Sequence, residues 1–146
     1  MTAVLPAGSL DGKVALVTGS SRGIGADTVR YLAEAGADVV INFRNKAPRA
    51  EKLAGELREL GRRALVVGAD LTDPESIAAM FDAVTNEYGR LDVLVLNASG
   101  GMESGMAEDY ELTLNRDAQL NVLRAAEPPL AEGARVGVVT SHRAAF

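Results

Sequence analysis

A glycine-rich loop with Gly19, Gly23 and Gly25 separates a short aliphatic run from a segment with helical spacing. Glycine lacks a Cβ atom, so such a backbone can approach a pyrophosphate closely while the next helix directs its first N–H groups at the anion. The spacing G-x-x-x-G-x-G differs from the common G-x-G-x-x-G, and Gly12-Lys13 is not followed by the Ser or Thr of a P-loop. The loop therefore indicates nucleotide binding and disfavours ATP hydrolysis, with a plain strand-to-helix turn as the alternative.

The residues after the second aliphatic run indicate which nucleotide the loop would take. In dinucleotide folds this segment meets the adenosine ribose, where an acid suits the 2′-hydroxyl of NAD and an arginine suits the 2′-phosphate of NADP. Residues 42–46 contain Arg44 and Lys46 but no acid, and Arg22 lies inside the glycine loop. A guanidinium offers paired, charge-assisted hydrogen bonds to phosphate. The segment favours NADP(H) over NAD(H), and the alternative is that Arg44 and Lys46 are solvated charges at a helix start.

These residues must be positioned by strands and helices that alternate along the chain. Short continuous apolar runs, typical of strands buried on both faces, alternate with longer segments of helical spacing. The alternation predicts βαβ units around a parallel sheet, an α/β fold of the doubly wound type with the order (βα)₄β. The predicted strands are residues 14–18, 39–43, 64–69, 93–96 and 136–139, and a helix follows each of the first four, the last over about 108–127.

Each of the first three predicted helices has an apolar face and a stop signal. Thr72 or Asp73 is suited to cap the third helix, since Pro74 fits its first turn and Glu75 complements the helix dipole. The stop signals are Gly36, Gly61 and Gly89, because glycine accepts the left-handed backbone found at helix ends. The predicted apolar faces are Ile24, Val29, Leu32 and Ala33; Ala50, Leu53, Ala54, Leu57 and Leu60; and Ile77, Met80, Phe81, Val84 and Tyr88.

Length, composition and charge limit the class of protein. The chain has 146 residues, 47% of them hydrophobic and 24% charged, which suits one compact domain. A net charge of −5 argues against binding nucleic acid or an anionic membrane, and no apolar run approaches the ~20 residues of a membrane span. The absence of cysteine excludes disulfides and suits the cytoplasm. We expect residues 1–11 to be a loose leader without signal-peptide features, and 12–146 to form a dinucleotide-binding domain.

The order of the motifs resembles one enzyme family. Residues 18–25, T-G-S-S-R-G-I-G, resemble the T-G-x-x-x-G-I-G signature of the short-chain dehydrogenase/reductase family. The resemblance continues in family order through Asp70-Leu71, Asn97-Ala98 and the regions of Asn115 and Ser141, over about residues 12–143. It implies a Rossmann-type fold and an NADP-dependent enzyme, similar to β-ketoacyl-carrier-protein reductases, that transfers a hydride between NADP(H) and a carbonyl or secondary alcohol.

The resemblance also implies a cofactor site without metal. Asp70 matches the residue that hydrogen-bonds the adenine amine in the family, and the alternative is that Asp70 belongs to the turn before the next helix. Residues 96–99, L-N-A-S, take the place of the family's N-N-A-G, with Leu96 for the first Asn and Ser99 for Gly, and the amide of Asn97 is still able to bridge strands. The predicted cofactor-binding residues are Gly19, Ser21, Arg22, Gly23, Ile24, Gly25, Arg44, Asp70, Leu71, Asn97, Ala98 and Ser99.

Part of the family's catalytic set is present. By resemblance, Asn115 is the catalytic Asn, with Asn121 as a second candidate, and Ser141 is the Ser that hydrogen-bonds the substrate oxygen. The alternatives are a polar helix residue and an ordinary turn serine. None of the three tyrosines has a lysine four residues later, whereas the family carries Tyr-x-x-x-Lys on the helix after the serine strand. We therefore expect a truncated fold, incomplete at the C-terminus, that binds cofactor weakly and shows no turnover alone.

Other interpretations remain open at this stage. The resemblance implies a small-molecule carbonyl or alcohol as partner, and a homo-oligomer for the full-length fold. A non-catalytic nucleotide-binding or interaction domain is the alternative function. Met102 and Met106 would line a substrate cleft or simply fill gaps, and His142 is interpreted as a loop residue.

Overall fold

The computed structural model describes residues 6–97 and 108–139, with side chains described for all of these except 108–115. Strands and helices alternate along the chain. The strands are β1 (Val14–Val17), β2 (Asp38–Phe43), β3 (Ala64–Gly68), β4 (Leu91–Leu96) and β5 (Leu130–Val138), and the helices are α1 (Gly23–Glu34), α2 (Ala47–Glu59), α3 (Pro74–Tyr88) and α4 (Glu108–Ala126).

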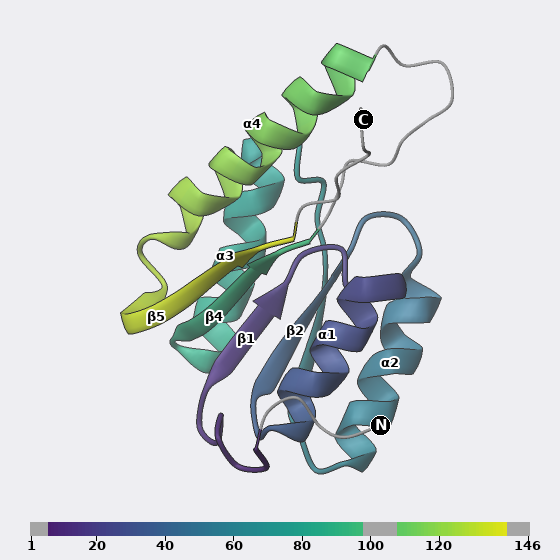
Figure 1. Ribbon diagram of the computed structural model, residues 1–146, viewed down its shortest axis with the longest axis vertical. Coiled ribbons are helices and arrows are strands. Elements are labelled where there is room, and N and C mark those ends of the chain that lie inside the picture. The colour runs from purple at the N-terminus through teal and green to yellow at the C-terminus, as the bar shows by residue number, and fades with distance from the viewer. Residues whose placement is uncertain (1–5, 98–107, 140–146) are drawn as a thin grey trace.

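The strands form one parallel sheet in the order β3-β2-β1-β4-β5 (Figure 1). The chain winds outward from β1 to β3 and then crosses to β4 on the other side of β1. The strand order therefore reverses between β1 and β4, and in doubly wound sheets ligands bind beyond the carboxyl ends of the strands at this reversal. The predicted α/β, doubly wound fold with the order (βα)₄β is confirmed.

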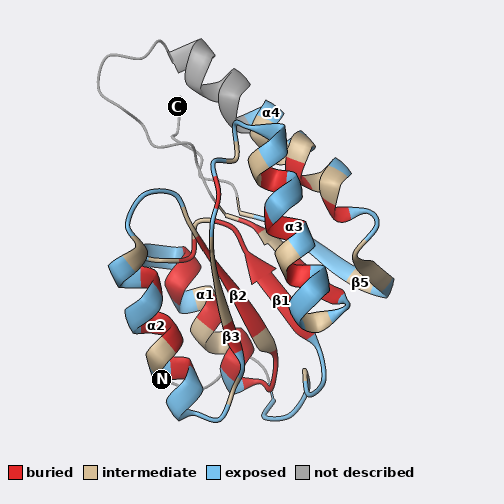
Figure 2. Cartoon of the chain, turned by 180° about the vertical axis from the view of Figure 1, so that it is seen from behind, coloured by how far each residue is buried: buried red, intermediate tan, exposed pale blue. Residues whose placement is uncertain are grey.

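Helices cover both faces of the sheet, and alternate strand residues enter two separate cores (Figures 1 and 2). Val17 of β1 and Ile41 of β2 pack with α1 and α2. Leu16 of β1 and Leu94 of β4 pack with α3 and α4. Successive side chains of a strand point to opposite faces, so a strand covered on both sides must be apolar throughout. This explains the continuous aliphatic runs in the sequence.

Two residues on the predicted apolar helix faces are exposed. Ile24 is 66% exposed in the first turn of α1, and Leu60 is 58% exposed just beyond the end of α2. Both stand at a helix end, where the helical period continues but the sheet no longer lies beneath it. The predicted apolar faces therefore extend beyond the surface that the sheet covers.

The last strand begins earlier than predicted, and it forms an exposed edge of the sheet. β5 begins at Leu130, and its pairing with β4 includes a register shift between Leu91 and Val93. Glu132 and Gly133 interrupt any apolar run before Val136, so the sequence pattern shows only the second half of the strand. Val136 and Val138 are 44% and 49% exposed because β5 is an edge strand of this sheet. The expected burial between two helix layers does not extend to these valines.

The helix ends follow their predicted signals. Asp73 is the N-cap of α3, and its carboxylate accepts a hydrogen bond from the backbone N–H of Glu75 at 3.0 Å. Gly89 ends α3 with a left-handed φ of 73°. Part of the predicted leader is held against α1, because the backbone N–H of Leu10 donates to the carbonyl of Ala35 at 2.9 Å. Leu10 also packs against the core beneath α1 and α2.

A buried carboxylate joins β4 to β1 at the amino end of the sheet. Asp92 is 6% exposed, and its Oδ2 accepts hydrogen bonds from the backbone N–H of Val14 and from Nε of Arg90, both at 2.9 Å. Nη2 of Arg90 donates to the other carboxylate oxygen. Burial acts to raise the pKa of Asp92, but the hydrogen bonds from Arg90 and Val14 outweigh it and hold the pKa below its ordinary value.

We expect Asp92→Asn to lower the free energy of unfolding by roughly 1.5–3 kcal/mol at neutral pH, because hydrogen bonds to a charged group are lost. A carboxylate with a lowered pKa stabilises the fold above its ordinary pKa of about 3.9, and this contribution disappears as the pH falls through the folded-state value. The difference between wild type and variant should therefore shrink below about pH 4. Urea unfolding, monitored by circular dichroism at several pH values, measures this difference in unfolding free energy.

Asp82→Asn, on the exposed side of α3, is the matched control and should leave the unfolding free energy nearly unchanged. A difference for Asp92→Asn that stays constant down to pH 3 would show that its charge does not stabilise the fold.

Candidate functional site at the carboxyl ends of the strands

The glycine loop follows β1 directly and leads into α1. Gly19 and Gly23 have φ values of 62° and 60°, in the left-handed region that glycine adopts most readily. Arg22 occupies the N-cap of α1 in an extended conformation, and its side chain makes no capping hydrogen bond. The first turn of α1 also contains no acidic residue. The N–H groups at this helix end, with the positive end of the dipole, are therefore suited to an anion.

Gly25 allows α1 to pack closely on the loop. A Cβ atom at this position would lie 2.6 Å from Nδ2 of Asn97 and 2.9 Å from Cα of Ser20, and it would also collide with the carbonyl oxygen of Gly19. The contacts with Ser20 and Gly19 are with backbone, which cannot swing aside as a flexible side chain does. Of the three glycines, two supply a left-handed turn and Gly25 supplies close packing.

Asn97 connects the end of β4 to the glycine loop. Its backbone N–H donates to Oγ1 of Thr18 at 2.9 Å, and its Nδ2 donates to the carbonyl of Gly19 at 3.2 Å. Thr18 in turn is tied to β4, because its own N–H donates to the carbonyl of Val95 at 3.0 Å. The amide of Asn97 thus joins the end of β4 to the glycine loop, where a bridge between strands was predicted, and these contacts fix the loop across the strand reversal.

The structure adds a residue that sequence reasoning missed. Asn42, only 2% exposed near the end of β2, accepts a hydrogen bond on Oδ1 from the N–H of Gly19 at 2.9 Å. Its Nδ2 donates to the carbonyl of Val67 in β3 at 3.3 Å. A buried polar side chain needs such partners. The available signal was an asparagine inside an otherwise apolar strand, and it was interpreted only as part of the segment before Arg44.

On the adenosine side of the predicted site, Asp70 organises a turn. Its Oδ1 accepts hydrogen bonds from the N–H of Thr72 at 2.9 Å and from Oγ1 of Thr72 at 2.6 Å. These bonds, followed by the positive charge of Arg44, hold the pKa of Asp70 below its ordinary value. Asp70 therefore belongs to the turn before α3, which was the alternative from sequence. It also lies within electrostatic reach of Arg44, and its contact with adenine stays a prediction.

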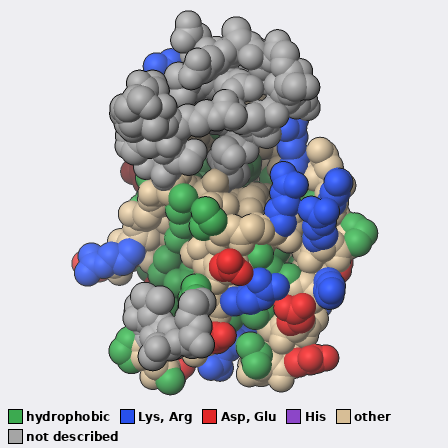
Figure 3. All heavy atoms as spheres, turned by 45° about the vertical axis from the view of Figure 1, so that its right-hand side comes forward, with side chains coloured by type: hydrophobic (Ala, Val, Ile, Leu, Met, Phe, Trp, Pro, Cys, Tyr) green, Lys and Arg blue, Asp and Glu red, His purple; other side chains and the backbone are tan. Residues whose placement is uncertain are grey.

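Exposed basic side chains accompany these strand ends. Arg22 and Arg44 are exposed, as are Lys46 and Arg49 at the start of α2. Figure 3 shows Lys and Arg side chains gathered on one flank of the molecule. The chain is acidic overall, yet Arg22 lies in the glycine loop and Arg44 follows two residues after Asn42, which contacts Gly19.

Several predicted site residues, or their side chains, lie outside the part of the chain that the structure describes. Ala98, Ser99 and Ser141 lie outside the described residues, as do Met102, Met106 and His142. Asn115 lies within α4, but its side chain is not described, and Asn121 is half-buried on the same helix. The catalytic roles of Asn115 and Ser141 stay predictions.

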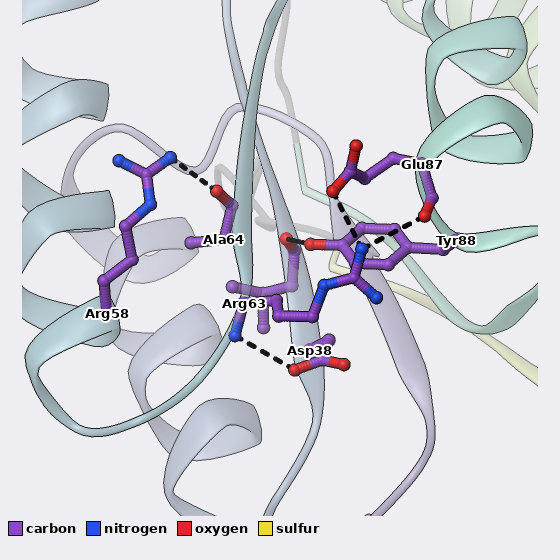
Figure 4. Close-up of polar contacts among 7 residues, drawn as sticks. Asp38, Arg58, Arg63, Ala64, Glu87 and Tyr88 are labelled. Carbon is purple, nitrogen blue, oxygen red and sulfur yellow. Dashed lines mark hydrogen bonds and ion pairs between the residues drawn. The ribbon is translucent and has the colours of Figure 1, made fainter.

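A second polar cluster lies at the opposite ends of the strands (Figure 4). Arg63 lies 4.7 Å above the ring of Tyr88 and forms an ion pair with Glu87 at 2.8 Å, while its backbone N–H donates to Asp38. The hydroxyl of Tyr88 donates to the carbonyl of Val39 at 3.0 Å. Burial raises the pKa of Tyr88 to about 12. A tyrosine held in this way serves to pack α3 on the sheet and is poorly suited to proton transfer near neutral pH.

Within residues 6–97 and 108–139, no group of three or more His, Cys, Asp or Glu side chains is arranged to hold a metal ion. None of the described helices is long and apolar enough to cross a membrane.

A doubly wound parallel sheet with a glycine-rich loop and an uncapped helix start at the strand reversal defines a Rossmann-type fold. The chain belongs to the short-chain dehydrogenase family, whose model matches residues 13–140. A short-chain dehydrogenase/reductase of Pestalotiopsis microspora is 40% identical over 141 residues, covering 92% of this chain and 53% of the relative. Versicolorin reductase of Emericella nidulans is 36% identical, with the same two coverages.

A solved structure is similar over the same region. The short chain dehydrogenase of Burkholderia cenocepacia, in complex with NADP, matches with a TM-score of 0.82 and 38% identity over 94% of this chain and 60% of its own. The chain therefore spans between half and two thirds of the length of these relatives. The match to the family model includes the glycine loop and all described strands, because that match covers residues 13–140.

We expect Gly25→Ala to destabilise the fold by roughly 1–3 kcal/mol, because the added methyl group must push α1 away from the loop. Gly55→Ala is a matched control, since Gly55 is a helical glycine in α2 whose Cβ would meet nothing within 4 Å. That substitution should stabilise by roughly 0.5–1 kcal/mol through helix propensity. Thermal and urea unfolding give the change in stability of each variant relative to wild type. Equal changes for the two variants would refute the packing role of Gly25.

Proposed function

We propose that the chain forms the NADP(H)-binding part of an oxidoreductase that interconverts a carbonyl compound and a secondary alcohol. The observation that carries the proposal is the glycine loop, held by Asn97 and Asn42 beside an uncapped helix start and flanked by Arg22 and Arg44. Membership of the family and the similarity to a dehydrogenase in complex with NADP support it.

The residues present fit this cofactor. The pyrophosphate would lie against the N–H groups at the start of α1, where Gly25 leaves no side chain between helix and loop. Ser21 is the hydroxyl we assign to the phosphates, because Ser20 is fully buried and its Oγ accepts from the N–H of Asn42 at 3.0 Å. Ile24, exposed at the same helix start, offers apolar surface to the cofactor.

The adenosine end distinguishes NADP from NAD. Arg22 and Arg44 would bind the 2′-phosphate, since guanidinium groups make paired, charge-assisted bonds to phosphate. Asp70 and Leu71 would contact adenine, with Asp70 already fixed by Thr72. Asn97, Ala98 and Ser99 would continue the binding surface beyond β4.

Bound NADP(H) supplies or accepts the hydride at its nicotinamide ring. Ser141 would hydrogen-bond the substrate oxygen and so orient the carbonyl, and Asn115 would complete the set contributed by this chain. We assign a small-molecule carbonyl or alcohol as substrate, in keeping with relatives such as versicolorin reductase. The net charge of −5 and the cysteine-free sequence support a cytoplasmic enzyme that binds neither nucleic acid nor membranes, and the family suggests a homo-oligomer for the complete fold.

Titration of the chain with NADPH and with NADH, followed by fluorescence, tests the cofactor assignment. NADPH should bind more tightly, and Arg44→Ala should weaken NADPH binding by about tenfold or more while changing NADH binding little, because one charge-assisted phosphate contact is lost.

Arg49→Ala also removes one positive charge, five residues further along the chain. It is the control for a loss of NADPH binding that comes only from the lower net positive charge. Equal losses for Arg44→Ala and Arg49→Ala would argue against a specific phosphate contact. Binding of neither cofactor would favour the non-catalytic interaction domain.

A further inference from the structure

Four hydrogen bonds join the end of β2 to the glycine loop and to β3. Oδ1 of Asn42 accepts from the N–H of Gly19, and Nδ2 of Asn42 donates to the carbonyl of Val67. The backbones of Asn42 and Ser20 are also connected, because the N–H of Ser20 donates to the carbonyl of Asn42 at 2.9 Å. The N–H of Asn42 donates to Oγ of Ser20 at 3.0 Å. We call Asn42 and Ser20 the loop clamp.

The loop clamp is fully enclosed. Ser20 is 0% exposed and Asn42 is 2% exposed, so neither side chain is available to touch a bound ligand. Hydrogen bonds in such surroundings are not weakened by competing water, and both side chains are held in one orientation. Any effect of the loop clamp on the ligand must therefore act through the residues that it positions.

Both cations of the proposed phosphate site stand two residues from the loop clamp. Arg22 follows Ser20 in the glycine loop, and Arg44 follows Asn42 at the end of β2. Two residues of extended chain span at most about 7 Å. The backbones of Arg22 and Arg44 therefore stay within this distance of Ser20 and Asn42. The loop clamp thus sets the separation between two segments that would otherwise belong to independent loops.

From this arrangement we propose that Asn42 and Ser20 are positioning residues for cofactor specificity, which hold Arg22 and Arg44 at the spacing that lets both meet one 2′-phosphate. The proposal rests on the proposed function, since it assumes that the site takes NADP(H). Removing hydrogen bonds of the loop clamp should therefore weaken the binding of NADPH more than the binding of NADH, because only the 2′-phosphate of NADPH contacts both cations.

Ser20→Ala and Asn42→Leu test the proposal in the 146-residue chain. Ser20→Ala removes one hydroxyl acceptor, and Asn42→Leu keeps the approximate shape of the side chain while removing its amide. In both variants the preference for NADPH over NADH, measured as the ratio of dissociation constants, should fall by about tenfold. Should Asn42→Leu fail to fold, Ser20→Ala alone decides.

Ile77→Val is the matched control for destabilisation. Ile77 is fully buried in the core beneath α3 and takes no part in the hydrogen bonds of the loop clamp, so its truncation lowers stability without removing any of them. It should leave the ratio of dissociation constants unchanged. A purely structural role for the loop clamp predicts that Ser20→Ala behaves like Ile77→Val, and that result would overturn the proposal.

The outcomes separate this proposal from the proposed function. Wild-type preference for NADPH, lost in Arg44→Ala, supports the cofactor assignment irrespective of the loop clamp. If that holds while both clamp variants keep the wild-type ratio, only the positioning role is overturned. If wild type shows no preference for NADPH, the cofactor assignment fails first and the positioning role falls with it.

Discussion

Helix α1 begins in contact with the backbone of the loop that precedes it, and this contact constrains the rest of the site. Gly25 permits it, since the space that a side chain would need is filled by Gly19, Ser20 and the amide of Asn97. With α1 packed on the glycine loop, its first N–H groups lie at the carboxyl ends of the central strands. A looser contact would leave the same residues in the chain but would move the helix dipole away from the strand reversal.

The two ends of the sheet use polar groups in different ways. At the amino ends, Asp92 binds Arg90 and the backbone of Val14, and Arg63 links Glu87 to the ring of Tyr88. These groups satisfy one another and hold the strands and α3 together. At the carboxyl ends, buried amides hold the loops while exposed arginines surround them. Groups that stabilise the fold thus lie at the amino ends of the strands, and the proposed ligand site lies at the carboxyl ends.

The sequence predicted most of what depends on local chemistry. Gly89 and Asp73 mark the ends of α3 because capping is decided within a few residues. Ile24 and Leu60 are exposed on their predicted apolar faces because a helical period gives the direction of a side chain and not the extent of the surface opposite it. Asn42 was missed because its partners, Gly19 and Val67, are more than twenty residues away on either side. Only the strand order brings them together.

The division of the interior by the sheet also bears on how the sequence is able to change over evolutionary time. Leu16 and Val17 are neighbours in the chain, yet one packs beneath α3 and α4 and the other beneath α1 and α2. Side-chain volumes in the two compartments are linked only through the strand backbones, so substitutions in one need not be compensated in the other. The core beneath α3 and α4 is therefore able to change without altering the core beneath α1, which supports the proposed nucleotide site.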